Sequence, residues 1–129
     1  MEKLLIDLIR GLEVNAYKRI PEGPTPPFAR VSLLGGPAAN SAQPAPGYLN
    51  KATFQVDVWA ETDPEAAEVA DEIRVAVLSA PREQPVEGSV FSFTTAEYPV
   101  FLPDADWPVN GRPGPRYSMT VRVSAHPAP

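Results

Sequence analysis

Histidine and cysteine, the side chains most often used as general bases, nucleophiles or transition-metal ligands, number one and none in this sequence. The single histidine, His126, stands in a proline-rich segment near the C-terminus. No neighbouring residue would orient its ring, as a general base requires. Cysteine is absent, which excludes a thiol nucleophile and a thiolate metal site. We therefore expect His126 to be a solvated tail residue and expect no catalytic residue in the chain.

Two groups of carboxylates come closest to forming a site. Asp104 and Asp106 stand beside Trp107 in a stretch rich in proline and glycine, where they could bind a hard cation or simply cap a turn. Four further acids lie between Glu65 and Glu72 in the first half of a predicted helix, where the helix dipole favours negative charge. Capping and solvation account for both groups, so we expect no metal site.

Nucleotide and nucleic-acid binding are also disfavoured. Gly35-Gly36 follows a predicted strand, but it lacks the spacing of a phosphate-binding loop and is followed by Pro37. The net charge is −5, and the eleven Lys and Arg residues are scattered, whereas neutralising phosphates needs clustered cations. We expect neither a cofactor nor sequence-independent binding of DNA.

Length and composition indicate one folded domain over residues 1–129. The chain has 43% hydrophobic and 21% charged residues, which is typical of globular proteins. The apolar run at the N-terminus is broken by Asp7 and Arg10, lacks the small-residue cleavage site of a signal peptide and is too short for a membrane span. We expect a cytosolic protein without a membrane anchor.

Periodicity of apolar residues predicts two amphipathic helices, Glu2–Lys18 and Pro64–Ser79. Asp63 is the N-cap candidate of the second helix. Prolines after each helix are expected to end it. Alternation and β-forming residues predict four strands, at Phe28–Leu34, Tyr48–Ala60, within Val86–Val100, and at Arg116–Ser124.

The seventeen prolines gather between these elements and predict irregular loops at about 36–48 and 101–115, with a frayed tail from His126. The predicted order is α-β-β-α-β-β. The expected fold is α+β, with a single mainly antiparallel sheet of about four strands and two helices packed on one face.

Trp59 lies on the face of its strand opposite Phe54, Val56 and Val58. An aromatic residue on a sheet face without helices is typical of an interface. Alternatively, Trp59 packs under one of the long loops, and the sequence leaves both interpretations open.

The chain resembles the tail terminator (tail completion) proteins of long-tailed bacteriophages, especially those infecting actinobacteria. The resemblance runs from Met1 to Val123 and depends on the order of elements and on a few short segments. These segments are the N-terminal helix, Pro27-Phe28-Ala29-Arg30-Val31-Ser32-Leu33, Phe54-Gln55-Val56-Asp57-Val58-Trp59-Ala60, the following Glu-Thr-Asp turn, the helix Glu65–Leu78 and Pro115-Arg116-Tyr117.

This resemblance implies a structural virion protein rather than an enzyme. Such a subunit joins five others in a hexameric ring that caps the tail tube, ends polymerisation of the tube protein and presents a surface to head-tail connector proteins. DNA would pass through the ring without specific binding. The location implied is the head-proximal end of the tail, after assembly in the host cytoplasm.

The residues that we expect at the subunit interface are Arg30, Trp59, Trp107, Arg112 and Arg116, with the arginines as partners for helix acids of a neighbouring subunit. Two alternatives stay open. The chain could be another head-tail connector or minor tail subunit. From a different class, it could be a small ligand-binding domain or enzyme with a pocket around Trp107 and Tyr98, although the sequence offers no acid, base and nucleophile together.

Overall fold

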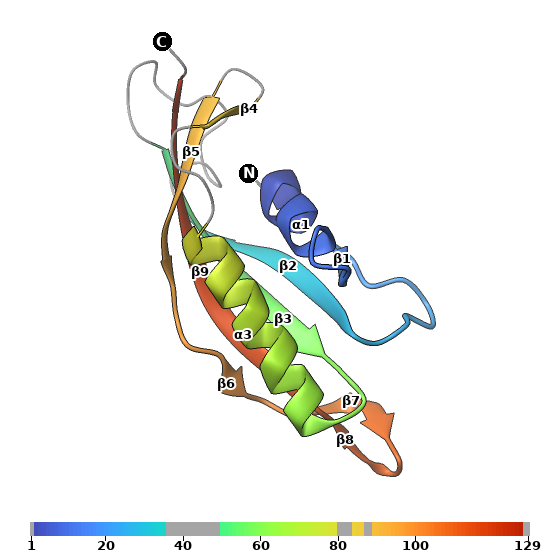
Figure 1. Cartoon of the computed structure of the whole chain (residues 1–129). Coiled ribbons are helices and arrows are strands. Elements are labelled where there is room, and N and C mark those ends of the chain that lie inside the picture. Colours follow the sequence, from blue (N-terminus) through green and yellow to red (C-terminus); the bar gives the residue numbers. More distant parts are fainter. Residues whose placement is uncertain (1, 36–49, 80–83, 87–88, 128–129) are drawn as a thin grey trace.

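The computed structural model describes residues 2–35, 50–79, 84–86 and 89–127, and the side chains of 5–34, 52–79 and 96–124. The described residues form an α+β fold with two helices, as predicted, and Figure 1 shows how the elements are arranged. The elements in chain order are α1 (Glu2–Arg10), β1 (Asn15–Tyr17), β2 (Phe28–Gly35), β3 (Asn50–Trp59), α3 (Asp63–Ser79), β4 (Gln84–Val86), β5 (Ser89–Ala96), β6 (Val100–Phe101), β7 (Asp104–Val109), β8 (Arg112–Gly114) and β9 (Arg116–Pro127).

Within the described residues, the main sheet has seven strands in the order β1-β2-β3-β9-β5-β4, with β6 pairing with β9 outside this path. The pair β1–β2 is parallel and the other pairs are antiparallel. The long strands β2, β3, β5 and β9 correspond to the four that the sequence predicts. The additional short strands β1, β4, β6, β7 and β8 raise the number of strands above the predicted four and interrupt the predicted order α-β-β-α-β-β.

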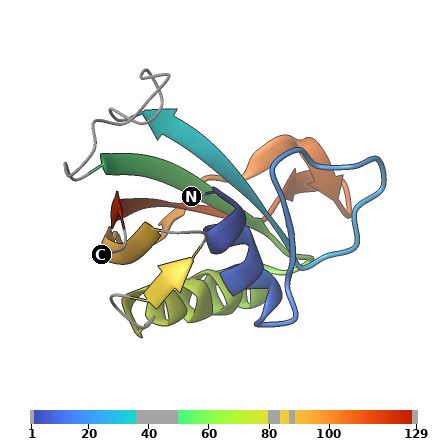
Figure 2. The ribbon, with the colours of Figure 1, turned by 90° about the horizontal axis from the view of Figure 1, so that it is seen from above.

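Both helices cover the same face of the sheet, as Figure 2 shows. One hydrophobic core joins Leu5 and Ile9 of α1, Ile73 and Val77 of α3, and inward side chains of the sheet such as Val121. On β3 this core face is formed by Ala52, Phe54, Val56 and Val58. Alternation in a strand places the intervening residues on the opposite face, which we call the helix-free face.

The first helix is shorter than predicted. It ends at Arg10, and the chain then turns through Gly11 to Glu13, whose φ is 63°. Ala16, which continues the helical spacing in the sequence, lies instead in β1 opposite Ala29 and is fully buried there. Gly11 favours an end to the helix because glycine is a poor helix former, and the positive φ of Glu13 takes the chain out of the right-handed helical region.

The second helix agrees closely with its prediction, since α3 spans Asp63–Ser79. Its N-cap is one residue earlier than predicted. The hydroxyl of Thr62 accepts a hydrogen bond from the Glu65 amide at 3.3 Å, which is the geometry of an N-cap residue. Asp63 is therefore free to bond elsewhere, and it accepts a hydrogen bond from Tyr117.

The prediction of an irregular loop at 101–115 is wrong. The segment contains the end of β6 and the hairpin β7–β8, whose closing pair is Val109 with Arg112. The two turn residues, Asn110 and Gly111, have φ values of 51° and 77°. An Asn-Gly pair with both φ angles positive is typical of a two-residue hairpin turn, and the sequence analysis, which considered only the surrounding prolines and glycines, missed this signal.

The predicted fraying from His126 is also wrong for the described backbone. Strand β9 continues to Pro127, where it pairs with Ser89 of β5. A long neighbouring strand satisfies the backbone groups that would otherwise be exposed at a chain end. The loop predicted at 36–48 and the tail residues 128 and 129 lie outside the described residues.

Candidate subunit interface

Three aligned strands place the predicted interface residues on the helix-free face. Phe28 of β2 lies opposite Trp59 of β3, and Trp59 lies opposite Arg116 of β9. Two residues further along these strands, and on the same face of the sheet, Arg30 lies opposite Asp57. These rows exist only because the three strands pair in this register.

The hairpin β7–β8 covers one end of this face and buries an aromatic cluster. The rings of Phe28 and Trp59 stack with their centroids 5.0 Å apart, and Trp107 meets Phe28 edge-on at 5.2 Å. The indole Nε1 of Trp59 donates a hydrogen bond of 2.9 Å to Oδ2 of Asp104. Trp59 is left only 2% exposed, so its surface is almost entirely used within the chain.

Two arginines complete the cluster. The guanidinium carbons of Arg30 and Arg116 lie 5.3 and 5.8 Å from the centroid of the Trp59 ring, within the range of cation–π attraction. Arg116 also donates through Nε to the Leu102 carbonyl at 2.8 Å. Arg30 forms an ion pair of 3.0 Å with the buried Asp57, which accepts further hydrogen bonds from Gln55.

The structure thus brings together Arg30, Trp59, Trp107 and Arg116, and leaves Arg112 apart on β8. Arg30 has its acidic partner in its own sheet rather than on a helix. Of the two interpretations of Trp59, the geometry matches packing under a loop, with the hairpin as the covering segment. Contact of these residues with another subunit stays a prediction.

An exposed apolar surface lies at the edge of the sheet, next to the hairpin. Tyr98, Val100, Phe101 and Leu102 are 74%, 58%, 44% and 43% exposed. We call these four residues the apolar edge, because β6 pairs with β9 on one side and, within the described residues, with no strand on the other. The sequence analysis missed this surface. A nearly continuous apolar run from Tyr98 to Leu102 is the signal that could have indicated it.

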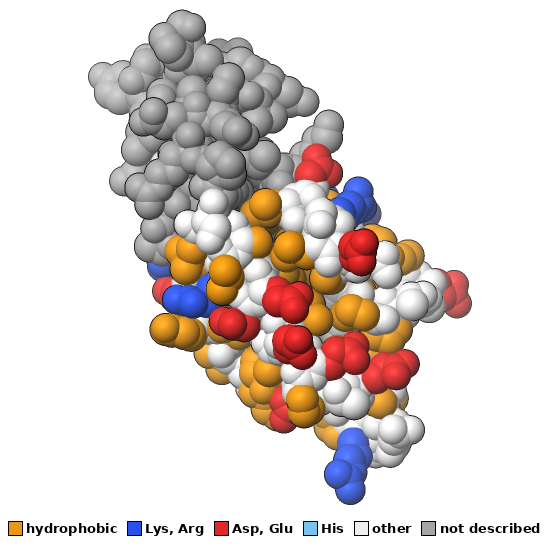
Figure 3. Space-filling view, in the orientation of Figure 1, with side chains coloured by type: hydrophobic (Ala, Val, Ile, Leu, Met, Phe, Trp, Pro, Cys, Tyr) orange, Lys and Arg blue, Asp and Glu red, His pale blue; other side chains and the backbone are white. Residues whose placement is uncertain are grey.

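The apolar edge is anchored to α3 at two points. The guanidinium carbon of Arg74 lies 3.9 Å from the centroid of the Tyr98 ring. Phe101 packs against Tyr117 with ring centroids 5.2 Å apart. The Tyr117 hydroxyl donates a 2.5 Å hydrogen bond to Asp63, and this bond is the main reason that the pKa of Tyr117 is raised above its ordinary value. Figure 3 shows that acidic side chains gather over α3 beside exposed hydrophobic ones.

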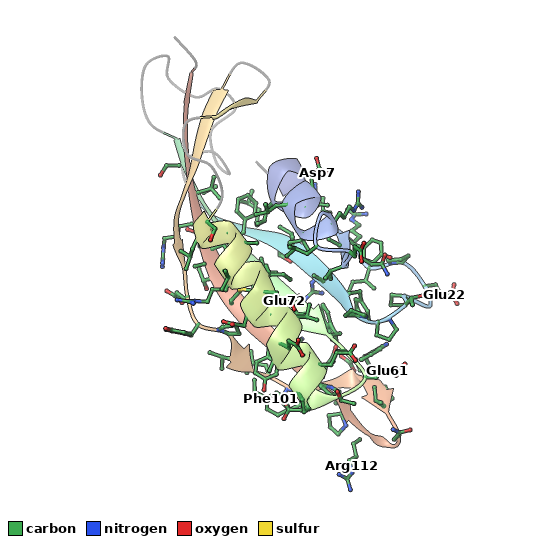
Figure 4. All side chains as sticks on the ribbon, in the orientation of Figure 1. Asp7, Glu22, Glu61, Glu72, Phe101 and Arg112 are labelled. Atoms are coloured by element: carbon green, nitrogen blue, oxygen red, sulfur yellow. The ribbon has the colours of Figure 1, made fainter. Side chains whose placement is uncertain are left out.

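A cleft of about 530 Å³ separates the start of α3 from the hairpin β7–β8. Figure 4 shows Glu61, Phe101 and Arg112 at this end of the molecule. Neither Trp107 nor Tyr98 lines this cleft. Those two residues lie on opposite faces of the sheet, since Trp107 contacts Phe28 and Tyr98 contacts Arg74. The residues that line the cleft are Glu61, Thr62, Asp63, Phe101, Val109, Asn110, Arg112, Pro113 and Pro115.

In the part of the chain that the structure describes, no three His, Cys, Asp or Glu residues are grouped so that they could hold a metal ion. No helix among the described residues combines the length and the apolar character needed to cross a membrane.

In comparisons with known proteins, no family model and no curated protein matches the chain.

Proposed function

We propose that this protein is a structural virion subunit, a tail terminator that assembles as a hexameric ring on the end of a phage tail tube. The ring ends polymerisation of the tube protein and forms the surface that head-tail connector proteins join. The protein acts at the head-proximal end of the tail and has no catalytic role. The observation that carries the proposal is the apolar edge.

The apolar edge supports an assembly role on physical grounds. An open strand edge offers unpaired backbone groups to any other strand, so soluble proteins usually protect such edges with charge, proline or a covering segment. Here Pro99 and Pro103 flank the short strand β6, yet four neighbouring side chains at the edge are apolar and well exposed. Exposed apolar surface of this kind is typical of a protein–protein contact, as a ring subunit requires.

The aromatic cluster supports a rigid subunit. Stacking of Phe28 on Trp59 and the hydrogen bond to Asp104 fasten the hairpin to the sheet. Because binding is stronger when the contacting parts are already ordered, a fixed hairpin favours repeated, identical contacts around a ring.

The charge of the chain suits a ring that DNA crosses. The net charge is −5, and a negative protein does not retain the phosphate backbone by releasing counterions. DNA passage without specific binding is therefore part of the proposal.

Native mass spectrometry over a series of protein concentrations, with electron microscopy of the largest species, tests this function. We expect a closed ring of six copies. A chain that stays monomeric throughout the series would contradict the ring. Adding the ring to a polymerising tail tube protein then separates a terminator, which stops tube growth, from another head-tail connector or minor tail subunit, which does not.

A second candidate function is small-ligand binding, favoured by the cleft between α3 and the hairpin. Its volume of about 530 Å³ falls within the usual range of ligand pockets. Thermal-shift screening tests this candidate, because a ligand that binds only the folded chain raises its melting temperature. A specific, saturable shift that is lost on Asn110→Trp would favour the ligand-binding domain over the ring subunit.

A further inference from the structure

The sheet has a second open edge on the side opposite β6. Strand β1 pairs with β2 only at residues 28–30. Beyond that point, residues 31–35 of β2 pair with β3 on one side and, within the described residues, with no strand on the other. Leu33 and Leu34 stand on this open stretch and are 40% and 56% exposed. Both edges of one sheet therefore carry exposed apolar side chains.

The two edges match face by face. Leu33 lies opposite the core residue Phe54, and Phe101 lies opposite Tyr117, which packs against the core, so both point to the helix-covered face. On the helix-free face, Val100 lies opposite Ser118, and Leu34 is the bulged residue beside Thr53. Each edge thus presents one apolar side chain to each face, which is the requirement for apolar cross-strand pairs on both faces.

The strand directions match as well. Strands β2, β3, β9 and β6 pair antiparallel in succession, so β2 and β6 run in opposite directions. Through these pairings β6 lies level with Ala29 and Arg30 of its own β2, which β1 covers. A second copy in the same orientation, displaced by a few residues along the strands, would therefore bring its open stretch of β2 to β6, and the two edges would be antiparallel. Their helices would stay on the same face of the joined sheet, because both helices of each copy cover one face.

We propose that the open stretch of β2 in one copy pairs antiparallel with β6 of a second copy, so that the sheet continues from subunit to subunit. This inference rests on the proposed function, because a ring needs a heterologous contact between two different surfaces of each copy. The segment that covers the apolar edge is thus the open stretch of β2 with Leu33 and Leu34 in the next subunit. Repetition of the contact requires no further surface.

Cysteine cross-linking tests the pairing, and the absence of native cysteine makes every cross-link assignable. The variant Leu34→Cys/Val100→Cys places one thiol on each edge on the helix-free face, and Leu33→Cys/Phe101→Cys does so on the helix-covered face. With at least one of these pairs we expect a ladder of covalent multimers on oxidation. Leu34→Cys combined with Val75→Cys is the matched control, because Val75 is 51% exposed but lies on α3, and it should give no ladder.

A charged residue at the edge gives the second measurement. Val100→Lys should raise the protein concentration at which half of the chains are assembled by about tenfold or more, because an inserted cation blocks pairing of edges. Val75→Lys should leave this concentration unchanged. Since Val100 is exposed, both variants are expected to keep the circular dichroism spectrum of the unmodified chain.

The outcomes separate this inference from the proposed function. A closed ring that forms normally with Val100→Lys and gives no ladder with either cysteine pair would overturn the edge pairing and leave the ring function standing. A ladder in a protein that forms open chains but no ring of six would support the edge pairing and contradict the ring. Dimers from Val100→Cys alone, or a monomer without any cross-link, would overturn the inference.

Discussion

The indole nitrogen of Trp59 and the carboxylate of Asp104 form a hydrogen bond of 2.9 Å that links the end of β3 to the start of β7. The other oxygen of the same carboxylate accepts a hydrogen bond from the Asp106 amide, also at 2.9 Å. The carboxylate of Asp104 therefore orders the backbone at the start of β7 and also holds the hairpin against the sheet.

Trp59→Phe should keep the stacking on Phe28 and lose the hydrogen bond to Asp104. We expect the free energy of unfolding to fall by about 1–2 kcal/mol, because a partly buried carboxylate oxygen loses its donor. Urea denaturation of Trp59→Phe, Asp104→Ala and the double variant measures the coupling between the two residues. Strictly additive losses would show that the hydrogen bond contributes nothing.

Asp57→Asn should destabilise the sheet by about 1–3 kcal/mol, because Arg30 loses its charged partner and a buried charge-assisted hydrogen bond is weakened. Asp57 is fully buried, while Arg30 is partly exposed, which keeps the expected loss below that of a fully buried pair. The exposed Asp106→Asn is the matched control and should change stability by no more than about 0.5 kcal/mol. Equal effects of the two substitutions would argue against an energetic role for the ion pair.

Gly114→Ala should displace the hairpin, because a Cβ atom at residue 114 would overlap the backbone carbonyl oxygen and the indole ring of Trp107. We expect a loss above about 2 kcal/mol together with a shift of tryptophan fluorescence, since backbone atoms cannot yield as a flexible side chain can. At Gly111, whose φ is 77° and which has open space around it, alanine should cost only about 1 kcal/mol of backbone strain. A smaller loss at residue 114 than at residue 111 would contradict this packing.

Tyr117→Phe should change the alkaline end of the stability profile. The hydrogen bond to Asp63 raises the pKa of Tyr117 in the folded chain above 10.0, so its contribution to stability is fully present below pH 10 and is lost as pH rises through the raised value. In urea midpoints measured from pH 8 to 11.5, we expect the phenylalanine variant to be less stable than the unmodified chain at pH 8 and to show a shallower alkaline decline. Tyr98→Phe serves as the control, and an identical decline in Tyr117→Phe and the unmodified chain would refute the role of the Asp63 bond.

Much of the fold follows from local patterns in the sequence. Strict alternation along Ala52–Ala60 predicts β3, and apolar spacing from Ala66 to Val77 predicts α3, because each pattern needs only the geometry of its own element. The same logic fails at the end of α1, where Ala16 fits the helical spacing but pairs with Ala29 in a parallel strand. Tertiary pairing outweighs periodicity when a single small residue suits both environments.

The hairpin β7–β8 illustrates a second limit. Prolines 103, 108, 113 and 115 predict an irregular segment because each lacks an amide donor. A two-stranded hairpin with a shifted register tolerates such residues, because few of its amides take part in pairing. Its turn was encoded locally in Asn110-Gly111, and only its place over Trp59 depended on the rest of the fold.

The sequence by itself determined the α+β class, the long strands, the second helix and the types of side chain available for an interface, since these depend on composition and short-range spacing. Tertiary structure alone decided that Phe28, Trp59, Trp107 and Arg116 meet in one cluster, because their approach requires the register of three strands and the fold of a distant hairpin. It likewise decided that β6 and the end of β2 stand at open edges. Which strand lies outermost in a sheet depends on how all the strands pair, and no local pattern carries that information.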